Sequence, residues 1–270
     1  MTAAVPSPLA PGSMHGLHAL ICGASKGIGR ATAFALAEAG ASLTLVSRNA
    51  ESLNEMARHM MEAGSAPVYP LAINLEDGTA IDEIMPGHLE AVGVIHIIIN
   101  NAAGPPSGPL LEATDMDFLL PLRRHLFAAQ RMVRHCLPGM VQSEYGRIIN
   151  IVSTSVREPI PNLGVSNTVR GAMAGWSKTL SRELPTCVTI NNVLPGFTDT
   201  NRLKTLITKK ASVQGKTEEE IANAMKASVP ANRFGQANEV ANAVAFLCSP
   251  AAAYINGINL PVDGGRTASL

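Results

Sequence analysis

The sequence has 270 residues, of which 46% are hydrophobic and 16% charged, so it can build a buried core and disorder is not expected. Its 21 Lys and Arg balance 21 Asp and Glu, and this zero net charge argues against nucleic acid and anionic membranes as partners. Four scattered cysteines, without C-x-x-C spacing or a metal-like pairing with histidine, are typical of a reduced cytoplasmic protein and predict no metal site.

The order of the apolar segments predicts an α/β fold. Residues 1–14 begin with a stretch rich in Ala, Pro and Ser and are expected to form a flexible leader, while 15–270 form a single domain. Short apolar runs, none long enough to span a membrane, alternate with helix-length segments such as 29–39 and 173–183. This alternation predicts a doubly wound, Rossmann-type domain with a seven-stranded parallel sheet flanked by helices. The predicted strands are 18–22, 42–46, 68–73, 94–99, 147–152, 188–193 and 258–262.

The turn after the first predicted strand is rich in glycine and precedes an apolar helix. Its spacing, G-x-x-x-G-x-G, permits a tight turn, a close approach of the backbone to a pyrophosphate and close helix–strand packing. The start of the helix offers free N–H groups to the phosphates. Any tight strand–helix turn can use a glycine, but this context favours a dinucleotide site. The residues assigned to the site are Gly23, Ser25, Lys26, Gly27, Ile28 and Gly29.

The end of the second predicted strand indicates which dinucleotide binds. A site that prefers NAD usually carries an acidic side chain there, which holds the ribose 2′-hydroxyl. This chain has Ser47 and Arg48 instead, with Lys26 in the glycine turn. Two cations and a hydroxyl favour a 2′-phosphate, so NADP(H) is expected in preference to NAD(H). The alternative is that Arg48 is solvated, or stacks on the adenine without selecting the cofactor.

Residues 200–230 form a long polar excursion where the alternation would otherwise go from a strand directly to a helix. In folds of this kind such a position, at the carboxyl end of a strand, is where a substrate lid lies. The segment could also be a solvated helical flap. Lys209, Lys210 and Lys216 could attract an anionic substrate, although a solvated face explains them as well.

Several motifs together resemble the classical short-chain dehydrogenases/reductases, closest to 3-oxoacyl-ACP-reductase-like members, from about His15 to Gly265. The resemblance implies that Asn74 and Leu75 flank the adenine, that Asn101 and Ala102 line the ribose side, and that Pro195, Gly196 and Thr198 hold the nicotinamide amide. The family pattern N-N-A-G has Ala103 in place of its glycine here. Besides the glycine turn, the motifs are 100–104 (NNAAG), 146–153 (GRIINIVS), 191–196 (NNVLPG) and 262–265 (VDGG).

The family's catalytic set is a serine, a tyrosine thirteen residues later, a lysine four residues beyond that, and an asparagine on the preceding helix. Ser153 matches the serine. Counted without gaps, Ser166 stands at the tyrosine position and Arg170 at the lysine position. His125 stands at the asparagine position. Three of the four positions therefore depart from the pattern.

These departures change the expected chemistry. A serine is shorter than a tyrosine and far less acidic than a phenol of pKa about 10, so Ser166 would need a bridging water to pass a proton. Arg170 stays protonated and can hold the ribose but cannot shuttle a proton. His125 could act as a general acid, or it could be a partly buried residue that satisfies a helix kink. Tyr145 precedes the fifth strand and is expected at the opposite end of the sheet.

Three functions stay open on this basis. The first is an NADP(H)-dependent carbonyl reductase or alcohol dehydrogenase with an atypical active site, in which Ser153, Ser166 and Arg170 act on a small-molecule carbonyl or alcohol. The second is another reaction on the same scaffold, such as dehydration, isomerisation or carbon–carbon cleavage. The third is a catalytically silent NADP(H)-binding partner, since function belongs to the site and not to the fold.

The resemblance also implies a homodimer or homotetramer that assembles through the helices carrying His125 and Arg170 and through the C-terminal region. Apolar residues on those helices could pack across a two-fold axis, although the core of a monomer would use the same side chains. They are Leu119, Leu122, Leu126, Met132, Met173, Trp176 and Leu180.

Overall fold

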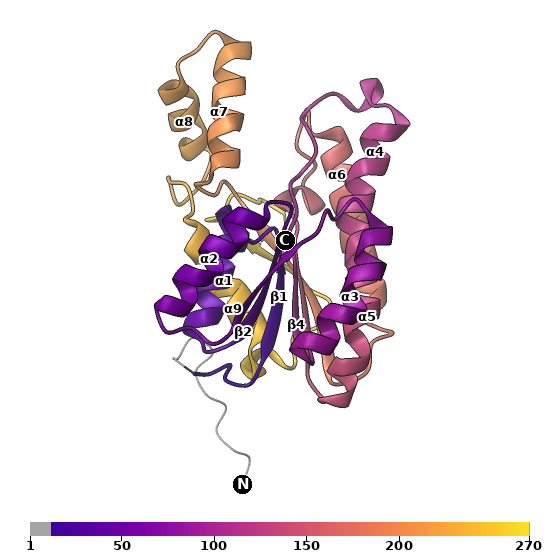
Figure 1. The fold of residues 1–270 in the computed structure, drawn as a ribbon. Coiled ribbons are helices and arrows are strands. Elements are labelled where there is room, and N and C mark those ends of the chain that lie inside the picture. The colour runs from indigo at the N-terminus through magenta and orange to yellow at the C-terminus, as the bar shows by residue number, and fades with distance from the viewer. Residues whose placement is uncertain (1–11, 270) are drawn as a thin grey trace.

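The computed structural model describes residues 12–269, which form a parallel sheet between two layers of helices (Figure 1). Most of the expected leader, residues 1–11, lies outside the described part. Met14, at its end, is fully buried and donates its N–H to the Ala39 carbonyl at 2.7 Å. Among residues 12–269 no helix is both long and apolar enough to cross a bilayer.

The sheet contains seven parallel strands in the order β3-β2-β1-β4-β5-β6-β7, as predicted. The strand order reverses between β1 and β4, and ligands of such folds bind beyond the carboxyl ends of the strands at this point. The apolar run 94–99 was predicted as a strand, but only its second half pairs with neighbouring strands. The strands are β1 His18–Cys22, β2 Ser42–Ser47, β3 Val68–Ala72, β4 Ile97–Asn100, β5 Gly146–Ile151, β6 Val188–Pro195 and β7 Asn259–Val262.

Helices cover both faces of the sheet and bury two apolar clusters. One cluster packs α1, α2 and α9 on one face, and the other packs α3 and α5 on the opposite face, with side chains of α6 at its edge. The strands between them are almost continuously apolar because both of their faces are covered. The helices are α1 Gly27–Glu38, α2 Ala50–Glu62, α3 Gly78–Val92, α4 Asp115–Leu122, α5 Ala128–Gln142, α6 Gly164–Leu180, α7 Asn201–Gln214, α8 Glu218–Ala227 and α9 Ala237–Cys248.

Four asparagines form a ladder across adjacent strands. Asn100 of β4 donates to Asn150 of β5, which donates to Asn192 of β6, which donates to Asn259 of β7, each at 2.8 Å. The residues are paired in register. Since buried amides need partners, the ladder satisfies these side chains and fixes the register of the four strands.

The excursion at 200–230 folds into a pair of helices, α7 and α8, that projects beyond the carboxyl ends of the strands (Figure 1). The pair has an apolar cluster of its own, apart from the clusters that cover the sheet. Its buried members are Leu203, Ile207, Ala211, Ile221 and Met225. The pair is thus a small folded unit, which we call the lid.

Part of the helix faces expected at a two-fold axis lies in the protein's own core. Met132 and Met173 are buried, and Trp176 and Leu180 pack against the cluster between the sheet and its helices. The two methionines are therefore used within one chain.

Candidate active site

The glycine turn has a shape that only glycine can adopt. Gly23 and Gly27 have positive φ angles of 62° and 57°. A Cβ on Gly29 would lie 2.2 Å from the carbonyl oxygen of Gly23, and a Cβ on Gly23 would lie 2.6 Å from that of Asn101. The protein's own backbone therefore excludes side chains at Gly23 and Gly29, and the turn can pack this tightly only with glycine at both positions.

The turn joins three strand ends at the point where the strand order reverses. The Asn101 amide donates to the carbonyl oxygens of Cys22 and Gly23, both at 3.3 Å, and the N–H of Ala24 donates to Val46 at 3.2 Å. Helix α1 then begins with no side-chain cap and with no acidic residue in its first turn. Its first N–H groups therefore face outward as an anion site, with Lys26 exposed beside them.

The loop after β2 places the residues predicted to select the cofactor. Ser47 accepts a hydrogen bond from the N–H of Asn49 at 3.3 Å, and Arg48 between them is exposed. Beyond β3, Asn74 accepts the N–H of Glu76 at 3.2 Å, and Leu75 points into an internal cavity. Ser25 and Ile28 are half-buried in the turn.

A small cavity lies between residues predicted to bind the cofactor and residues predicted to act in catalysis. It is bounded by the ends of β1, β4 and β5 and by helices α5 and α6. Four residues predicted from different motifs therefore meet around one space, together with Leu75. They are Asn101, Ala102, His125 and Arg170.

Ser153, Ser166 and Arg170 lie where β5 ends and α6 begins. The Ser153 Oγ accepts the N–H of Ser155 at 3.1 Å, so its own hydrogen stays free to donate. Arg170 is buried and donates from Nη1 to the Ile151 carbonyl at 2.8 Å. Burial lowers the pKa of Arg170 to about 10, with a further contribution from Arg202, so the guanidinium is protonated at neutral pH.

Ser166 lies four residues before Arg170 on α6, so the two side chains share a helix face. The Ser166 hydroxyl has no hydrogen-bond partner within the described part of the chain. It is therefore available to a ligand or a water molecule.

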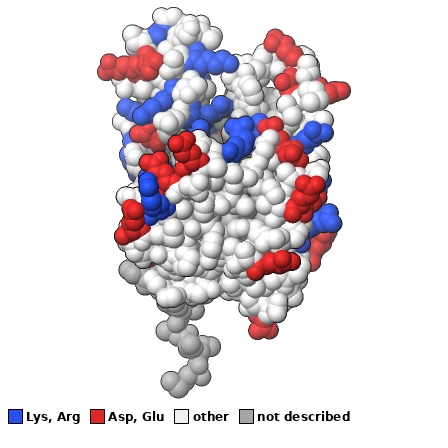
Figure 2. Space-filling model, viewed as in Figure 1, with Lys and Arg blue, Asp and Glu red and all other residues white. Residues whose placement is uncertain are grey.

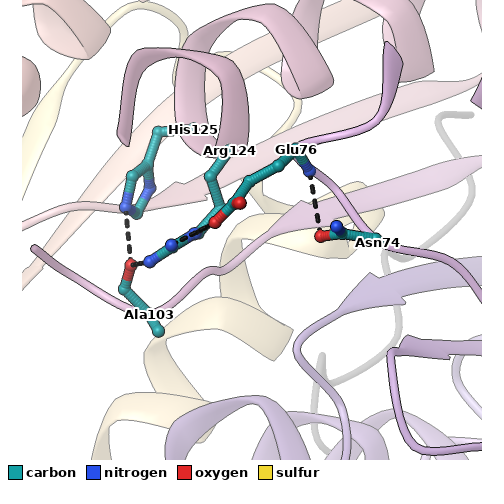
Figure 3. A network of polar contacts seen from close by, with 5 residues as sticks. All are labelled: Asn74, Glu76, Ala103, Arg124 and His125. Atoms are coloured by element: carbon teal, nitrogen blue, oxygen red, sulfur yellow. Dashed lines mark hydrogen bonds and ion pairs between the residues drawn. The ribbon is translucent and has the colours of Figure 1, made fainter. Parts of the chain in front are cut away.

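His125 lies in an irregular turn of the helix, but its ring contacts the loop after β4 and, within residues 12–269, not the helix backbone. A π-helical turn, Arg123–Phe127, interrupts the helix between α4 and α5, and His125 lies at its centre with Nε2 3.1 Å from the carbonyl oxygen of Ala103 (Figure 3). Burial first, and then the charge of Arg170, hold the pKa of His125 well below its usual range. A neutral, buried imidazole bonded to a carbonyl is poorly placed to donate a proton to a substrate.

A second side chain fixes the same carbonyl. Arg124 donates from Nη1 to the oxygen of Ala103 at 2.9 Å and from Nε to Glu76 at 2.8 Å, and it forms an ion pair with Glu76 (Figure 3). Arg124, which lies 48 residues beyond Glu76 in the chain, thus links the loop after β3 to the loop after β4 through its bonds to Glu76 and Ala103. Sequence reasoning missed it, because no local pattern relates the two residues.

The replacement of a family glycine by Ala103 fits the local backbone. Among the described residues, positive φ angles occur outside glycine only at Glu144, Asn162 and Asn232. Ala103 therefore has an ordinary backbone conformation, and its methyl group is accommodated without strain of that kind.

The segment after β6 returns to the glycine turn. Gly196 lies so close to Asp263 that a Cβ would be 2.7 Å from the Asp263 Cα, and Thr198 is buried. Two residues later Thr200 occupies the N-cap position of α7 without a side-chain hydrogen bond to the helix, and its methyl group lies 3.5 Å from the position a Cβ on Gly27 would occupy. Thr200 was not predicted as a site residue, although it follows the matched P-G motif closely.

Tyr145 lies at the amino end of β5, as predicted, and donates its hydroxyl to the Cys248 carbonyl at 2.6 Å. Burial raises the pKa of Tyr145 to about 12. It is therefore structural. Within residues 12–269 the four cysteines are unpaired, and no three potential metal ligands gather into a cluster.

Comparison with known proteins adds three findings. Residues 23–267 match the family described as Enoyl-(Acyl carrier protein) reductase. The chain is 33% identical over 256 residues to 3-oxoacyl-[acyl-carrier-protein] reductase FabG of Vibrio harveyi, covering 94% of this chain and 98% of that one. It is 31% identical to NADPH-dependent reductase BacG of Bacillus subtilis, with 93% and 98% covered.

Among solved structures, L-sorbose reductase from Gluconobacter frateurii, complexed with NADPH and L-sorbose, superposes with a TM-score of 0.91 at 28% identity. The match covers 98% of this chain and all of that one. Both the order of the elements and nearly the full length are therefore shared with NADPH-dependent reductases.

Proposed function

The chain belongs to the classical short-chain dehydrogenase/reductase family, and from this premise we propose that it is an oxidoreductase. It transfers hydride between NADP(H) and the carbonyl or alcohol group of a small molecule. The observation that carries the proposal is the glycine turn. Its backbone excludes any Cβ at Gly23 and Gly29 and meets the uncapped start of α1, an arrangement that fits a pyrophosphate.

NADP(H) is proposed over NAD(H) because of the charges around the second strand. Arg48 is exposed at its end, and no carboxylate stands at residues 47–49 to hold a ribose hydroxyl or repel a phosphate. Two similar proteins support this choice: BacG is an NADPH-dependent reductase, and the sorbose reductase was solved in complex with NADPH. In the Arg48→Asp variant we expect NADPH affinity to fall about tenfold or more while NADH affinity holds or rises.

When bound, NADPH would provide the hydride for the carbonyl carbon of the substrate. As the π electrons move to oxygen, the Ser153 hydroxyl donates a hydrogen bond to the developing negative charge, and the Arg170 guanidinium adds positive potential. A fixed donor of this kind contributes roughly 3 kcal/mol. Ser166, through a water, passes the proton that neutralises the oxygen, and solvent replaces that proton.

His125 has a different role in this proposal. It positions the Ala103 carbonyl from behind the site and takes no part in proton transfer, because its pKa is far below neutral and its Nε2 contacts that carbonyl. Arg170 also holds the ribose of the cofactor, where the family uses a lysine.

A second candidate is a catalytically silent NADP(H)-binding protein. The replacement of the family tyrosine by Ser166 favours it, because an aliphatic hydroxyl is a poor acid. Fluorescence titration with NADPH tests the shared cofactor site, and turnover of 3-oxoacyl thioesters, diketones and aldehydes separates the two candidates. If the double variant Ser166→Tyr, Arg170→Lys gains activity that the wild type lacks, the silent candidate is supported. If the double variant loses activity that the wild type has, Ser166 and Arg170 take part in catalysis and the reductase is supported.

We also propose that the protein is cytoplasmic and assembles as a homodimer or homotetramer. Strand β7 lies at the edge of the sheet and is only half-buried, and Tyr254 nearby is fully exposed. Unpaired edges and exposed aromatic side chains are features that association covers. Light scattering on the purified protein measures the oligomeric state directly, and a monomer at micromolar concentration would contradict the proposal.

A further inference from the structure

Basic side chains converge on one short loop after β4. Arg124 and His125 contact the carbonyl of Ala103, as described above. Further along the same loop, the Nη2 atom of Arg170 lies 3.4 Å from where a Cβ of Gly104 would be. Two side chains of α7 reach the loop from the lid: Arg202 donates to the Pro105 carbonyl at 2.9 Å, and Lys209 donates to the Ser107 hydroxyl at 2.9 Å.

The cations on the two sides of this loop differ in their counter-ions. Arg124, on the cofactor side, pairs with Glu76. Arg170 and Arg202 have no carboxylate partner within residues 12–269. Arg170 approaches Gly104 and Arg202 bonds Pro105, the next residue, so two guanidinium groups without carboxylate partners approach the same part of the loop.

Arg170 makes this arrangement costly in the free protein. Only 8% of the residue is exposed, and its one hydrogen bond goes to a backbone carbonyl. A buried guanidinium is stable when an anion and further hydrogen bonds compensate for lost hydration. The nearby charge of Arg202 contributes to the lowered pKa of Arg170, as expected for like charges without an anion between them.

The lid continues this basic surface above the loop. The face of α7 that lines an open hollow carries two lysines, three hydroxyl residues and one valine: Lys204, Thr205, Thr208, Lys209, Ser212 and Val213. Figure 2 shows a notch at the top of the molecule, with Lys and Arg side chains along its left wall and floor. A substrate that enters here meets positive charge before it reaches the floor of the site.

The reacting end of the cofactor cannot supply the missing anion, because the nicotinamide and its ribose carry no negative charge. We propose that the substrate does: it is a small carbonyl compound with a carboxylate or phosphate group that binds between Arg170 and Arg202. Ser153 lies two residues after Ile151, to which Arg170 donates a hydrogen bond. Ser166 lies one helical turn before Arg170. The two proposed catalytic serines are therefore close in the chain to the groups that contact or precede Arg170. The anionic group is therefore a few bonds from the carbonyl, as in a short oxo acid. This inference rests on the proposed reductase function.

Binding of malonate tests the proposal, because malonate is a short dianion that cannot be reduced at such a site. Malonate and its neutral counterpart malonamide are titrated calorimetrically into the protein saturated with NADPH. We expect malonate to bind at least tenfold more tightly than malonamide, and Arg202→Gln to weaken malonate about tenfold while NADPH affinity is unchanged. Lys210→Gln removes the same charge from α7 outside the face that lines the hollow, and it should change malonate affinity less than about twofold.

Two results would overturn the proposal. One is equal affinity for malonate and malonamide, and the other is equal weakening by Arg202→Gln and Lys210→Gln, each variant first shown to keep the wild-type melting temperature. Reduction of neutral ketones alongside either result would leave the proposed function intact. If NADPH itself does not bind, the proposed function fails, and malonate titration of the nucleotide-free protein still decides whether Arg202 belongs to an anion site.

Discussion

The two ends of the sheet bury arginine in different ways. At the amino end, Arg147 is 4% exposed, and its guanidinium lies 4.2 Å from the centre of the Tyr145 ring. Its Nη1 donates to the carbonyl of Gly146 at 2.8 Å and to that of Cys187 at 3.4 Å. At the carboxyl end, Arg170 donates to one carbonyl and faces no aromatic ring among residues 12–269. The first arginine faces an aromatic ring and two carbonyls of the fold, although its buried Nε has no partner among residues 12–269. The second has most of its donors left for a ligand.

Two hydroxyls, those of Thr44 and Ser166, follow the same division, although the buried Oγ1 of Thr189 near the amino end has no partner in the described part of the chain. Near the amino end, Thr44 lies between His18 and His88 with 2.8 Å to each, so these polar groups satisfy one another. At the carboxyl end, the hydroxyl of Ser166 has no partner among residues 12–269. Polar groups that hydrogen-bond one another, such as Thr44 and its two histidines, stabilise the fold. A hydroxyl without a partner, such as that of Ser166, is available to a ligand.

The largest effect on NADPH affinity is expected from a methyl group added at the most crowded position of the glycine turn, Gly29. In Gly29→Ala, the added methyl would meet the Gly23 carbonyl oxygen at 2.2 Å, so the turn must shift. We expect NADPH affinity to fall by at least about 100-fold in a fluorescence titration. Gly171→Ala, at an exposed helix position with nothing within 4 Å, is the matched control and should bind NADPH normally. Normal binding by Gly29→Ala would contradict the proposed pyrophosphate site.

The closed network at the amino end predicts sensitivity to acid. Burial, together with His88 and His96, lowers the pKa of His18 to about 4 from 6.5. Between these values the unfolded chain binds the proton and the folded chain does not, so stability is complete above pH 6.5 and falls as the pH approaches 4. The loss amounts to roughly 3 kcal/mol.

Urea denaturation at pH 7, 5.5 and 4.5 measures this loss. His18→Gln keeps an amide that can reach Thr44 but cannot titrate, so its stability should depend less steeply on pH than that of the wild type. Contributions from the carboxylates and from His125 are common to both proteins and cancel in the difference. Parallel pH profiles would show that His18 is not the sensitive group.

Paired substitutions of the two arginines test the comparison itself. Arg147→Met removes the ring contact and two hydrogen bonds, and we expect it to cost about 2 kcal/mol of unfolding free energy. Arg170→Met removes a buried charge without a counter-ion, so its stability should stay within about 0.5 kcal/mol of the wild type or rise. Denaturant titrations measure the unfolding free energy of both variants. Equal losses of unfolding free energy would show that the fold depends on Arg147 and Arg170 to the same extent.

The smallest effect is expected at the ion pair between the cofactor loops. Glu76→Gln keeps the size of the side chain but weakens its hold on Arg124, which fixes the Ala103 carbonyl. Because both side chains are partly exposed, we expect NADPH affinity to fall no more than about fivefold. Glu83→Gln, an exposed acid on α3, serves as the control, and a matching loss there would indicate a general charge effect.

The sequence determined the architecture and the cofactor half of the site. Seven apolar runs with helical segments between them dictate a parallel sheet, because strands covered on both faces must be apolar along their length. The turn at Gly23, Gly27 and Gly29 was predictable for a similar reason: its conformation depends on residues adjacent in the chain. The residue spacing of the family's catalytic set, counted from Ser153, identified Ser166 and Arg170.

Only the tertiary structure decided what surrounds those residues. The pairing of Arg124 with Glu76, the contact of Arg202 with Pro105 and the neutral state of His125 depend on segments 22 to 97 residues apart in the chain. Spacing along a sequence cannot give such distances, because they are set by how helices and loops pack at the carboxyl ends of the strands. Burial likewise requires the complete fold, and burial is what makes Arg170 a charge in need of an anion and His125 a neutral support.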